Sequence, residues 1–333
     1  MPANPVQPAV DGDHQRRRRA CNRAGSDLVP WRRRLLALRA AYGRLATRRF
    51  GASAGAGWRR ALAYALTAPY FAQLATTPRA RVRLVSATTA LALAEGLGVR
   101  RRPTFAVAVE HRHGTSRFAV GGLSELEVLS EVFLHGTYEL ELATAPATVI
   151  DAGANIGASM HAFAIRHPAA RLIGLEPAPG VLERLRENTR SLPRAELREV
   201  ALAGHDGSVL LTVGRDSWAS STLATGTGGS SVEVRAVTLE TLIDELAIDR
   251  VDLLKLDIEG SELAALAAVR RWDRIGTIVL EWHGDLHGQP VTMLRDLLPA
   301  HHHRASPISG EPQRSYVVAW PRGGEEPRTA RID

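Results

Sequence analysis

The order of hydrophobic and polar residues changes near residue 147. Beyond that point, short apolar runs alternate with stretches in which apolar residues recur every three or four positions. The first pattern predicts buried strands and the second predicts helices. The expected strands are 148–150, 171–175, 197–202, 208–213, 232–237, 251–256, 277–282 and 316–320. The expected helices are 158–167, 179–189, 239–246, 291–298 and one that begins at Ser261.

This alternation predicts an α/β fold with a doubly wound, parallel, Rossmann-like sheet. Such sheets bind their ligands at the carboxyl ends of the strands. One stretch departs from the pattern, because the two strand-like segments between 208 and 237 follow each other without a helix. They are expected to form an insertion or a hairpin beside the sheet. The Gly/Ser/Thr tract at 217–231 is expected to be a mobile loop.

The part of the chain before residue 141 follows other patterns. Residues 1–28 are rich in Pro, Asp and Arg without apolar periodicity, which predicts a disordered basic arm. Residues 29–140 are expected to form an Arg-rich, helical accessory region with short strands. The catalytic domain is expected over 141–322, and a tail over 323–333.

The basic character of the chain is local. The formal net charge is +7, but the first 60 residues hold 14 arginines against three aspartates, so the remaining residues carry −4. The arm could therefore make weak contact with an anionic surface. The acidic balance of the catalytic half argues against nucleic acid as a partner.

The cysteine content and hydropathy bear on the compartment. The single cysteine, Cys21, excludes an internal disulfide framework and fits a reducing compartment. No apolar run reaches the ~18 residues of a membrane span. The N-terminal residues also lack the pattern of a secretory signal. A cytoplasmic location is therefore expected.

A glycine turn and an acidic residue follow the first two expected strands. The first strand runs into Asp151-Ala-Gly-Ala-Asn-Ile-Gly157, a sequence that permits a tight turn and presents helix N–H groups to an anionic group. The second strand ends in Glu176-Pro177, where an acid fits the two hydroxyls of a ribose. A dinucleotide fingerprint needs glycine where Asn155 stands. The pattern therefore favours S-adenosylmethionine over NAD.

Three segments together resemble the FkbM family of S-adenosylmethionine-dependent methyltransferases. They are Val149-Ile-Asp-Ala-Gly-Ala-Asn-Ile-Gly157, Ile173-Gly-Leu-Glu-Pro177 and Val251-Asp-Leu-Leu-Lys-Leu-Asp-Ile-Glu-Gly-Ser-Glu262, with a weaker echo at 131–139. The resemblance covers roughly residues 140–320 and implies a class I methyltransferase domain. It implies that the glycine turn cradles the methionine part of the cofactor, that Glu176 binds the ribose and that the segment after the third strand flanks the adenine. The cofactor-binding residues so implied are Asp151, Gly153, Ala154, Asn155, Gly157, Glu176, Pro177, Val200, Ala201 and Asp257.

Four residues near the ends of the fourth and fifth strands are the catalytic candidates. They are Asp257, Lys255, Glu281 and His283. Methyl transfer needs an aligned acceptor and help in removing its proton. His283 is a suitable base, and a carboxyl group whose pKa is raised by burial is another.

Two of these residues also have a structural interpretation. Lys255 is the only lysine of the chain, which indicates a place where a compact ammonium is needed. It is equally consistent with a buried ion pair to Glu281, or to Asp257. The cluster of Asp257, Glu259, Glu281 and His283 also has the ligand types of a divalent-metal site, so a divalent metal is possible there but not expected.

The predicted function is methyl transfer to a hydroxyl of a natural product, sugar or glycolipid, so the partner is a small-molecule or glycan acceptor. The Arg-rich arm leaves an RNA methyltransferase open as an alternative. A non-catalytic cofactor-binding module is a second alternative, and an NAD-dependent enzyme is disfavoured by Asn155. The sequence does not fix the acceptor or the oligomeric state.

Overall fold

The computed structural model describes residues 62, 65–66, 68–97, 99, 104–111, 114–213, 230–284, 288–308 and 311–329. The predicted basic arm and most of the Gly/Ser/Thr tract lie outside these residues. Within them, no helix is long and apolar enough to cross a membrane.

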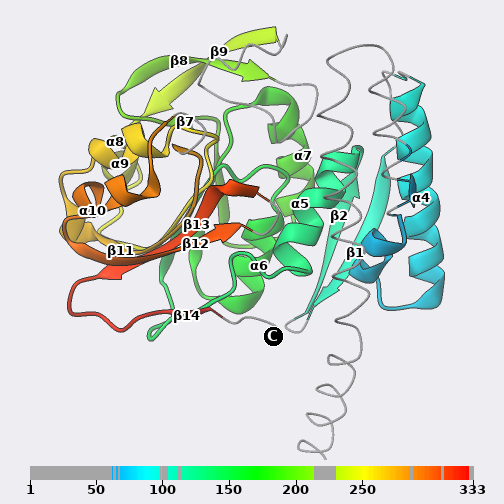
Figure 1. The fold of residues 1–333 in the computed structure, drawn as a ribbon, viewed down its shortest axis with the longest axis horizontal. Helices are drawn as coiled ribbons and strands as arrows, with labels where there is room; N and C mark the ends of the chain where they lie inside the picture. Colours follow the sequence, from blue (N-terminus) through cyan, green and yellow to red (C-terminus); the bar gives the residue numbers. More distant parts are fainter. Residues whose placement is uncertain are drawn as a thin grey trace, which may run out of the picture.

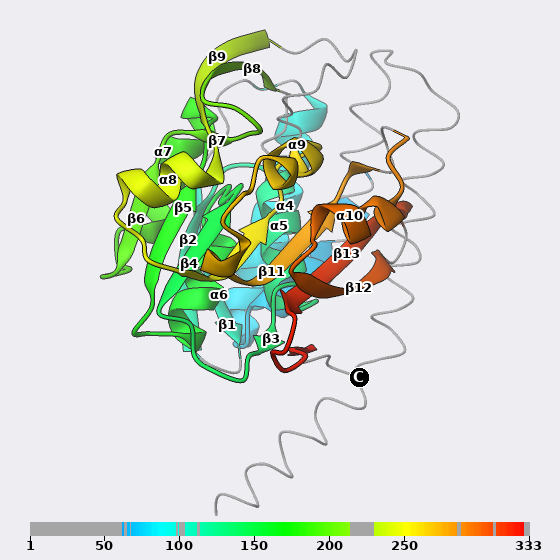
Figure 2. The same ribbon diagram turned by 90° about the vertical axis from the view of Figure 1, so that its left-hand side faces the viewer.

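A seven-stranded sheet forms the centre of the fold (Figures 1 and 2). In spatial order its strands are β12 (His301–Ile308), β13 (Glu311–Pro321), β11 (Ile275–Trp282), β10 (Val251–Leu256), β4 (Thr148–Ala152), β5 (Arg171–Leu175) and β6 (Ala195–Arg198). The pairs from β11 to β6 are parallel, whereas β13 runs antiparallel to both β11 and β12. The predicted doubly wound α/β fold is confirmed, but an all-parallel sheet is wrong.

The antiparallel edge follows from β12, a strand that the apolar pattern of the sequence does not mark. β12 and β13 are separated by only two residues, and so short a connection can join only antiparallel strands. β12 begins with His301-His-His-Arg304, which lacks the apolar run expected of a buried strand. It lies at the sheet edge, where polar residues are common because solvent is close.

Helices cover both faces of the sheet (Figure 1). Successive strand residues point to opposite faces: Val149 packs in one hydrophobic cluster and Ile150 in the other. The first cluster is completed by α5 (Leu123–Phe133), α6 (Ala158–Arg166) and α7 (Pro179–Thr189). The second is completed by α8 (Leu239–Glu245), α9 (Glu262–Ala267) and α10 (Leu294–Leu297). Because these strands are buried on both faces, their sequences are near-continuous apolar runs.

Local sequence signals set several helix boundaries. α7 begins at Pro179, a position where proline is favoured because the first turn of a helix does not use its N–H groups for internal hydrogen bonds. Thr238 caps α8, with its hydroxyl accepting a hydrogen bond from the Thr241 N–H at 3.2 Å, as the sequence predicted. The predicted helix at 291–298 is divided into a 3-10 turn (Val291–Met293) and α10.

A small sheet lies beside the main one. It contains β7 (Ala201–Leu202), β9 (Ser230–Val237) and β8 (Gly207–Val213), and in both views β8 and β9 lie above the main sheet (Figures 1 and 2). The prediction of a hairpin beside the sheet is confirmed. The predicted single strand at 197–202 is wrong, because the chain leaves β6 after Arg198 and pairs with β9 from Ala201.

The accessory region packs against the first hydrophobic cluster. It includes the 3-10 turn η1 (Ala72–Leu74), α4 (Pro78–Gly96) and a hairpin of β1 (Phe105–His111) and β2 (Gly114–Val120), with α4 beside the hairpin in Figure 1. The Asn188 side chain of α7 joins this hairpin to the main domain. Its Oδ1 accepts from the Ala119 N–H at 2.7 Å, and its Nδ2 donates to the Ile156 carbonyl at 2.9 Å.

The ends of the expected catalytic domain also meet. β3 (Leu140–Glu141) pairs with β14 (Arg328–Thr329), so the segment predicted to be a tail contains a strand. This pairing places the start of the expected catalytic domain next to the residues that follow it.

The order of the strands creates a switch point between β4 and β10. The chain proceeds from β4 outward to β5 and β6, and later from β10 outward to β11. Connections that leave in opposite directions open a crevice at the carboxyl ends of the two strands. Gly153 follows β4 at this crevice with φ +76°, and a Cβ there would overlap the carbonyl oxygen of Asp257 after β10.

Gly153→Ala should therefore lower the free energy of unfolding by more than about 2 kcal/mol, because alanine is strained at positive φ and the two strand ends would have to separate. Gly180→Ala is the matched control. A Cβ at Gly180 meets nothing within 4 Å, and alanine favours the helix in which it lies. Urea unfolding of both variants tests the prediction, and equal stabilities would contradict it.

Candidate active site

A left-handed turn connects β4 to α6. Gly153, Asn155 and Gly157 all have positive φ, and Gly157 precedes the first residue of α6. The N–H groups of Gly153 and Ala154 donate to the Leu175 carbonyl at 3.0 and 2.9 Å. The predicted glycine turn is thus present, and its backbone is tied to the end of β5.

Glu176 lies directly after β5 and faces this turn. One carboxylate oxygen accepts from the Asn155 N–H and the other from the Ala178 N–H, both at 3.0 Å. Burial raises the pKa of Glu176 to about 7, although these hydrogen bonds and Lys255 act in the opposite direction. The group therefore changes charge near neutral pH.

A pocket opens where the turn, β5 and β10 end. Among the predicted site residues, its lining contains Gly153, Asn155, Glu176, Pro177, Val200, Ala201 and Asp257. Glu259, considered from the sequence only as a possible metal ligand, also lines the pocket. The other lining residues were not assigned to the site from the sequence, and they are Leu175, Leu202, Leu211, Ile258 and Ser261. Leu211 comes from β8, so a residue of the small sheet completes one wall. Its apolar character gave no signal that distinguished it from a core residue.

Three predicted cofactor residues lie behind this lining. Asp151 and Ala154 are buried, and Gly157 forms the start of α6. Both Asp151 oxygens have neighbours within the protein: Oδ2 accepts from the Ser159 hydroxyl at 2.5 Å, and Oδ1 lies 2.9 Å from Lys255 Nζ. The carboxylate of Asp151 therefore supports the turn from beneath.

Lys255 is buried at the same point, with 2% of its side chain exposed. Its ammonium donates to the carbonyls of Gly153 at 2.7 Å and Ala152 at 3.4 Å. It also lies 3.8 Å from Asp257 Oδ2 and 5.2 Å from the centre of the Tyr138 ring. Burial acts to lower the pKa of Lys255, but Asp151 and Asp257 raise it above its ordinary value.

The predicted pairing of Lys255 with Glu281 is wrong. The register places Lys255 opposite Asp151 on β4 and opposite Val279 on β11, so Glu281 lies two residues farther along its strand. Glu281 instead lies beside His283. Lys255 also does not contribute to the pocket lining, so it lies behind the candidate active site.

Asp257 lines the pocket, and a residue of the accessory region, Tyr138, bonds to it. The Tyr138 hydroxyl donates to Asp257 Oδ2 at 3.0 Å. Burial raises the pKa of Asp257, with Glu281 acting in the same direction and Lys255 against it. Tyr138 was not predicted as a site residue, although it lies within the weaker family echo at 131–139.

His283 lies beside three glutamates. Its Nδ1 is 2.9 Å from Glu262 Oε1, while its Nε2 is 3.4 Å from Glu281 Oε1 and 3.5 Å from Glu259 Oε2. Burial alone would lower the pKa of His283, but the glutamates raise it to about 11. A histidine that retains its proton at neutral pH is a poor general base, so this arrangement speaks against the expected base role.

The strand order with one antiparallel strand near its edge is that of a class I methyltransferase. Residues 151–304 match the methyltransferase FkbM domain. The chain belongs to this family and is an S-adenosylmethionine-dependent methyltransferase.

Several named relatives are similar to part of this chain. The chain is 30% identical over 183 residues to the 31-O-demethyl-FK506 methyltransferase FkbM of Streptomyces tacrolimicus, covering 44% of this chain and 70% of that protein. It is 26% identical over 202 residues to methyltransferase sdnD of Sordaria araneosa, covering 50% and 78%. It is 26% identical over 174 residues to the 2-O-methyltransferase NoeI of Sinorhizobium fredii, covering 46% and 71%.

Lys255→Met should lower the free energy of unfolding by about 3–5 kcal/mol, because Asp151 would remain buried without its ammonium partner. Adding Asp151→Asn should restore much of this loss. Urea denaturation of the single and double variants measures both effects.

Arg186→Met provides the control for this pair. Arg186 and Glu199 form an ion pair with about half of each side chain exposed, and breaking such a pair costs at most about 1 kcal/mol. If Lys255→Met were no more damaging than this control, the buried pair would not support the strand ends.

Proposed function

We propose that this protein transfers the methyl group of S-adenosylmethionine to a hydroxyl group of a small-molecule or glycan acceptor. The observation that carries the proposal is the pocket itself. It combines the glycine turn and Glu176, which suit a nucleoside with an amino-acid tail, with the carboxylates of Asp257 and Glu259, which suit a reacting hydroxyl.

The residues of the turn fit the cofactor. Glu176 is the acid that would accept hydrogen bonds from the ribose hydroxyls. Asn155 Oδ1 is a buried acceptor without a hydrogen-bond partner among the described residues, and it suits the ammonium of the methionine part. Val200, Ala201 and Leu211 supply an apolar wall for the adenine.

Bound S-adenosylmethionine supplies an electrophilic methyl group on a positively charged sulfur. The acceptor oxygen forms the new C–O bond while the C–S bond breaks, and the bonding electrons remain on sulfur as a neutral thioether. The acceptor must lose its hydroxyl proton in this process. Asp257, at the pocket wall, is the residue that we propose to assist that loss, with Tyr138 fixing its orientation.

The acceptor class is supported by the names of the relatives. Two of them are named for methyl transfer to oxygen: the 31-O-demethyl-FK506 methyltransferase and the 2-O-methyltransferase NoeI. A natural product, a sugar or a glycolipid is accordingly the proposed acceptor. Tyr138 belongs to the accessory region and bonds to Asp257, so this region would help to form the acceptor site.

Calorimetry with S-adenosylhomocysteine and with NAD tests the cofactor assignment. We expect the first ligand to bind more tightly, and Glu176→Ala to weaken its binding by about 1.5–3 kcal/mol, because hydrogen bonds to a charged acceptor are lost. Glu183→Ala, an exposed change on α7, should have little effect. Tighter binding of NAD, or equal effects of the two variants, would overturn the assignment.

Binding of S-adenosylhomocysteine should also depend on pH through Glu176. The pKa of this carboxyl is about 7 in the free protein, so lowering the pH below that value protonates it and removes acceptor capacity for the ribose. Affinity should be greatest near about pH 8 and fall by up to about tenfold per pH unit below 7. Glu176→Gln should bind weakly and without this dependence; an unchanged pH profile in this variant would exclude Glu176 as the cause.

A further inference from the structure

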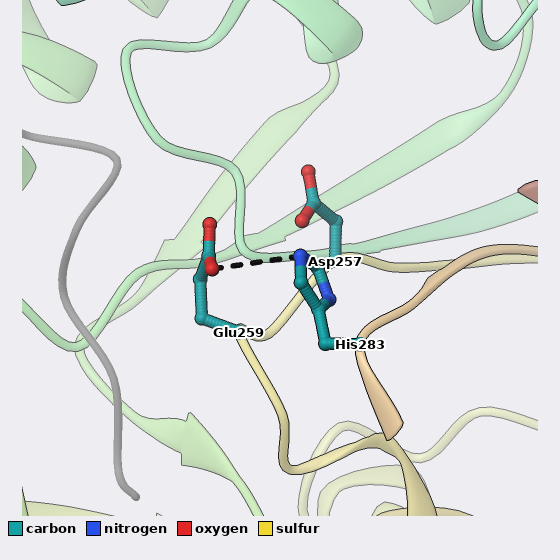
Figure 3. A group of neighbouring side chains, drawn as sticks. All are labelled: Asp257, Glu259 and His283. Atoms are coloured by element: carbon teal, nitrogen blue, oxygen red, sulfur yellow. Dashed lines mark ion pairs between the residues drawn. The ribbon is translucent and has the colours of Figure 1, made fainter. Parts of the chain in front are cut away.

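Three side chains converge at the pocket wall from the ends of β10 and β11. Asp257 and Glu259 follow β10, His283 follows β11, and one potential ligand atom from each lies within 4.8 Å of the others (Figure 3). We infer that Asp257, Glu259 and His283 form a binding site for a divalent metal ion.

The orientation of His283 carries this inference. Its ring is buried, and Nδ1 is fixed by the 2.9 Å hydrogen bond to Glu262 Oε1. Nε2 is buried without a hydrogen-bond partner among the described residues, and it lies 3.5 Å from Glu259 Oε2 and 3.4 Å from Glu281 Oε1. An ion bound there would replace the proton that His283 retains in the metal-free protein. Metal-binding histidines are typically held in this way, with a carboxylate on the far nitrogen that presents the other nitrogen to the ion.

Glu262 is itself firmly placed for this task. It has only 1% of its side chain exposed, and Oε1 also accepts from the N–H groups of Ile258 and Gly260 at 3.3 and 3.2 Å. These backbone bonds belong to the turn that carries Glu259. One buried acid thus fixes both the histidine and the loop that supplies a second ligand.

The two carboxylates complete a suitable ligand set. The Tyr138 hydroxyl orients Asp257, and the Glu259 Oε2 lies 3.5 Å from His283 Nε2. Adjacent ligands of an ion with bonds of about 2.1 Å lie about 3 Å apart, so a small inward movement would suffice. Two carboxylates with one imidazole suit a first-row divalent ion such as Mn²⁺.

The position of the site gives the ion a function. Asp257 and Glu259 both line the pocket, so the remaining coordination positions would face the acceptor. With an ion bound, Asp257 would serve as its ligand and not as the base. The ion would lower the pKa of a hydroxyl bound to it, and the released proton would pass to water in the pocket. This catalytic role rests on the proposed function, whereas metal binding by the three residues does not.

Titration of the metal-free full chain with Mn²⁺, followed by electron paramagnetic resonance and calorimetry, tests the site. We expect one bound ion per chain. Glu259→Gln should weaken binding by at least about tenfold, because an anionic ligand becomes a neutral amide. Glu183→Gln, on the exposed side of α7, should bind Mn²⁺ as the unaltered protein does.

Asp257→Asn serves as a second ligand variant, and circular dichroism shows whether each variant is folded. Absence of Mn²⁺ binding, or equal binding by a folded ligand variant and the unaltered protein, would overturn the site. S-adenosylhomocysteine is titrated in parallel. If S-adenosylhomocysteine binds while Mn²⁺ does not, the metal site fails and the proposed function stands. If Mn²⁺ binds while S-adenosylhomocysteine does not, the metal site stands and the proposed function fails.

Discussion

The ion pair between Lys255 and Asp151 is the interaction on which the site depends. It joins the next-to-last residues of β10 and β4, the strands between which the crevice opens, at a point where both side chains are almost fully buried. The same ammonium bonds to the carbonyl of Gly153, so one group fixes both strands and the first residue of the turn. An arginine fork has the same charge but a larger, planar head, and the space beside Gly153 and Tyr138 suits a compact ammonium. The only lysine in an arginine-rich chain therefore has a physical reason to lie here, and the reason is support of the site.

Much of the fold could be predicted because local sequence and burial agree. β5 and α7 have the predicted boundaries, since an apolar run and an amphipathic pattern each end at a clear signal. The turn after β4 and the acid after β5 were also predictable, because positive φ and a strand-end carboxylate need particular residue types. The nearer partner of Lys255, Asp151, was not predictable, since it depends on which strand lies on each side of β10 and in what register. The apolar pattern did not mark β12, because a polar edge strand has no such pattern. Tyr138 was missed, because a tyrosine distant in sequence shows no sign of the aspartate it contacts.

The acidic residues near the pocket differ in their partners and in their access to ligands. Asp151 is neutralised by Lys255 beneath the turn. Glu262 is occupied by a histidine ring and two backbone N–H groups. Glu176 bonds to backbone N–H groups but remains at the pocket wall, where its charge responds to pH near neutrality. The carboxylates that follow β10 also reach the wall. Residues of one chemical type thus divide into a buried set that fixes geometry and an accessible set that faces ligands.

This division also explains why the accessory region matters to the site. Tyr138 precedes the expected catalytic domain, yet its hydroxyl bonds to Asp257 and its ring lies against Lys255. The hairpin of β1 and β2 is bound through Asn188 to the Ile156 carbonyl, within the turn that follows β4. Movement of the accessory region would therefore displace a pocket carboxylate and the turn together. The cofactor-binding turn and the acceptor side of the pocket both depend on contacts with the accessory region. We therefore expect binding of the cofactor to favour order on the acceptor side, and binding of the acceptor to favour order in the turn, with Asp257 as the residue common to both.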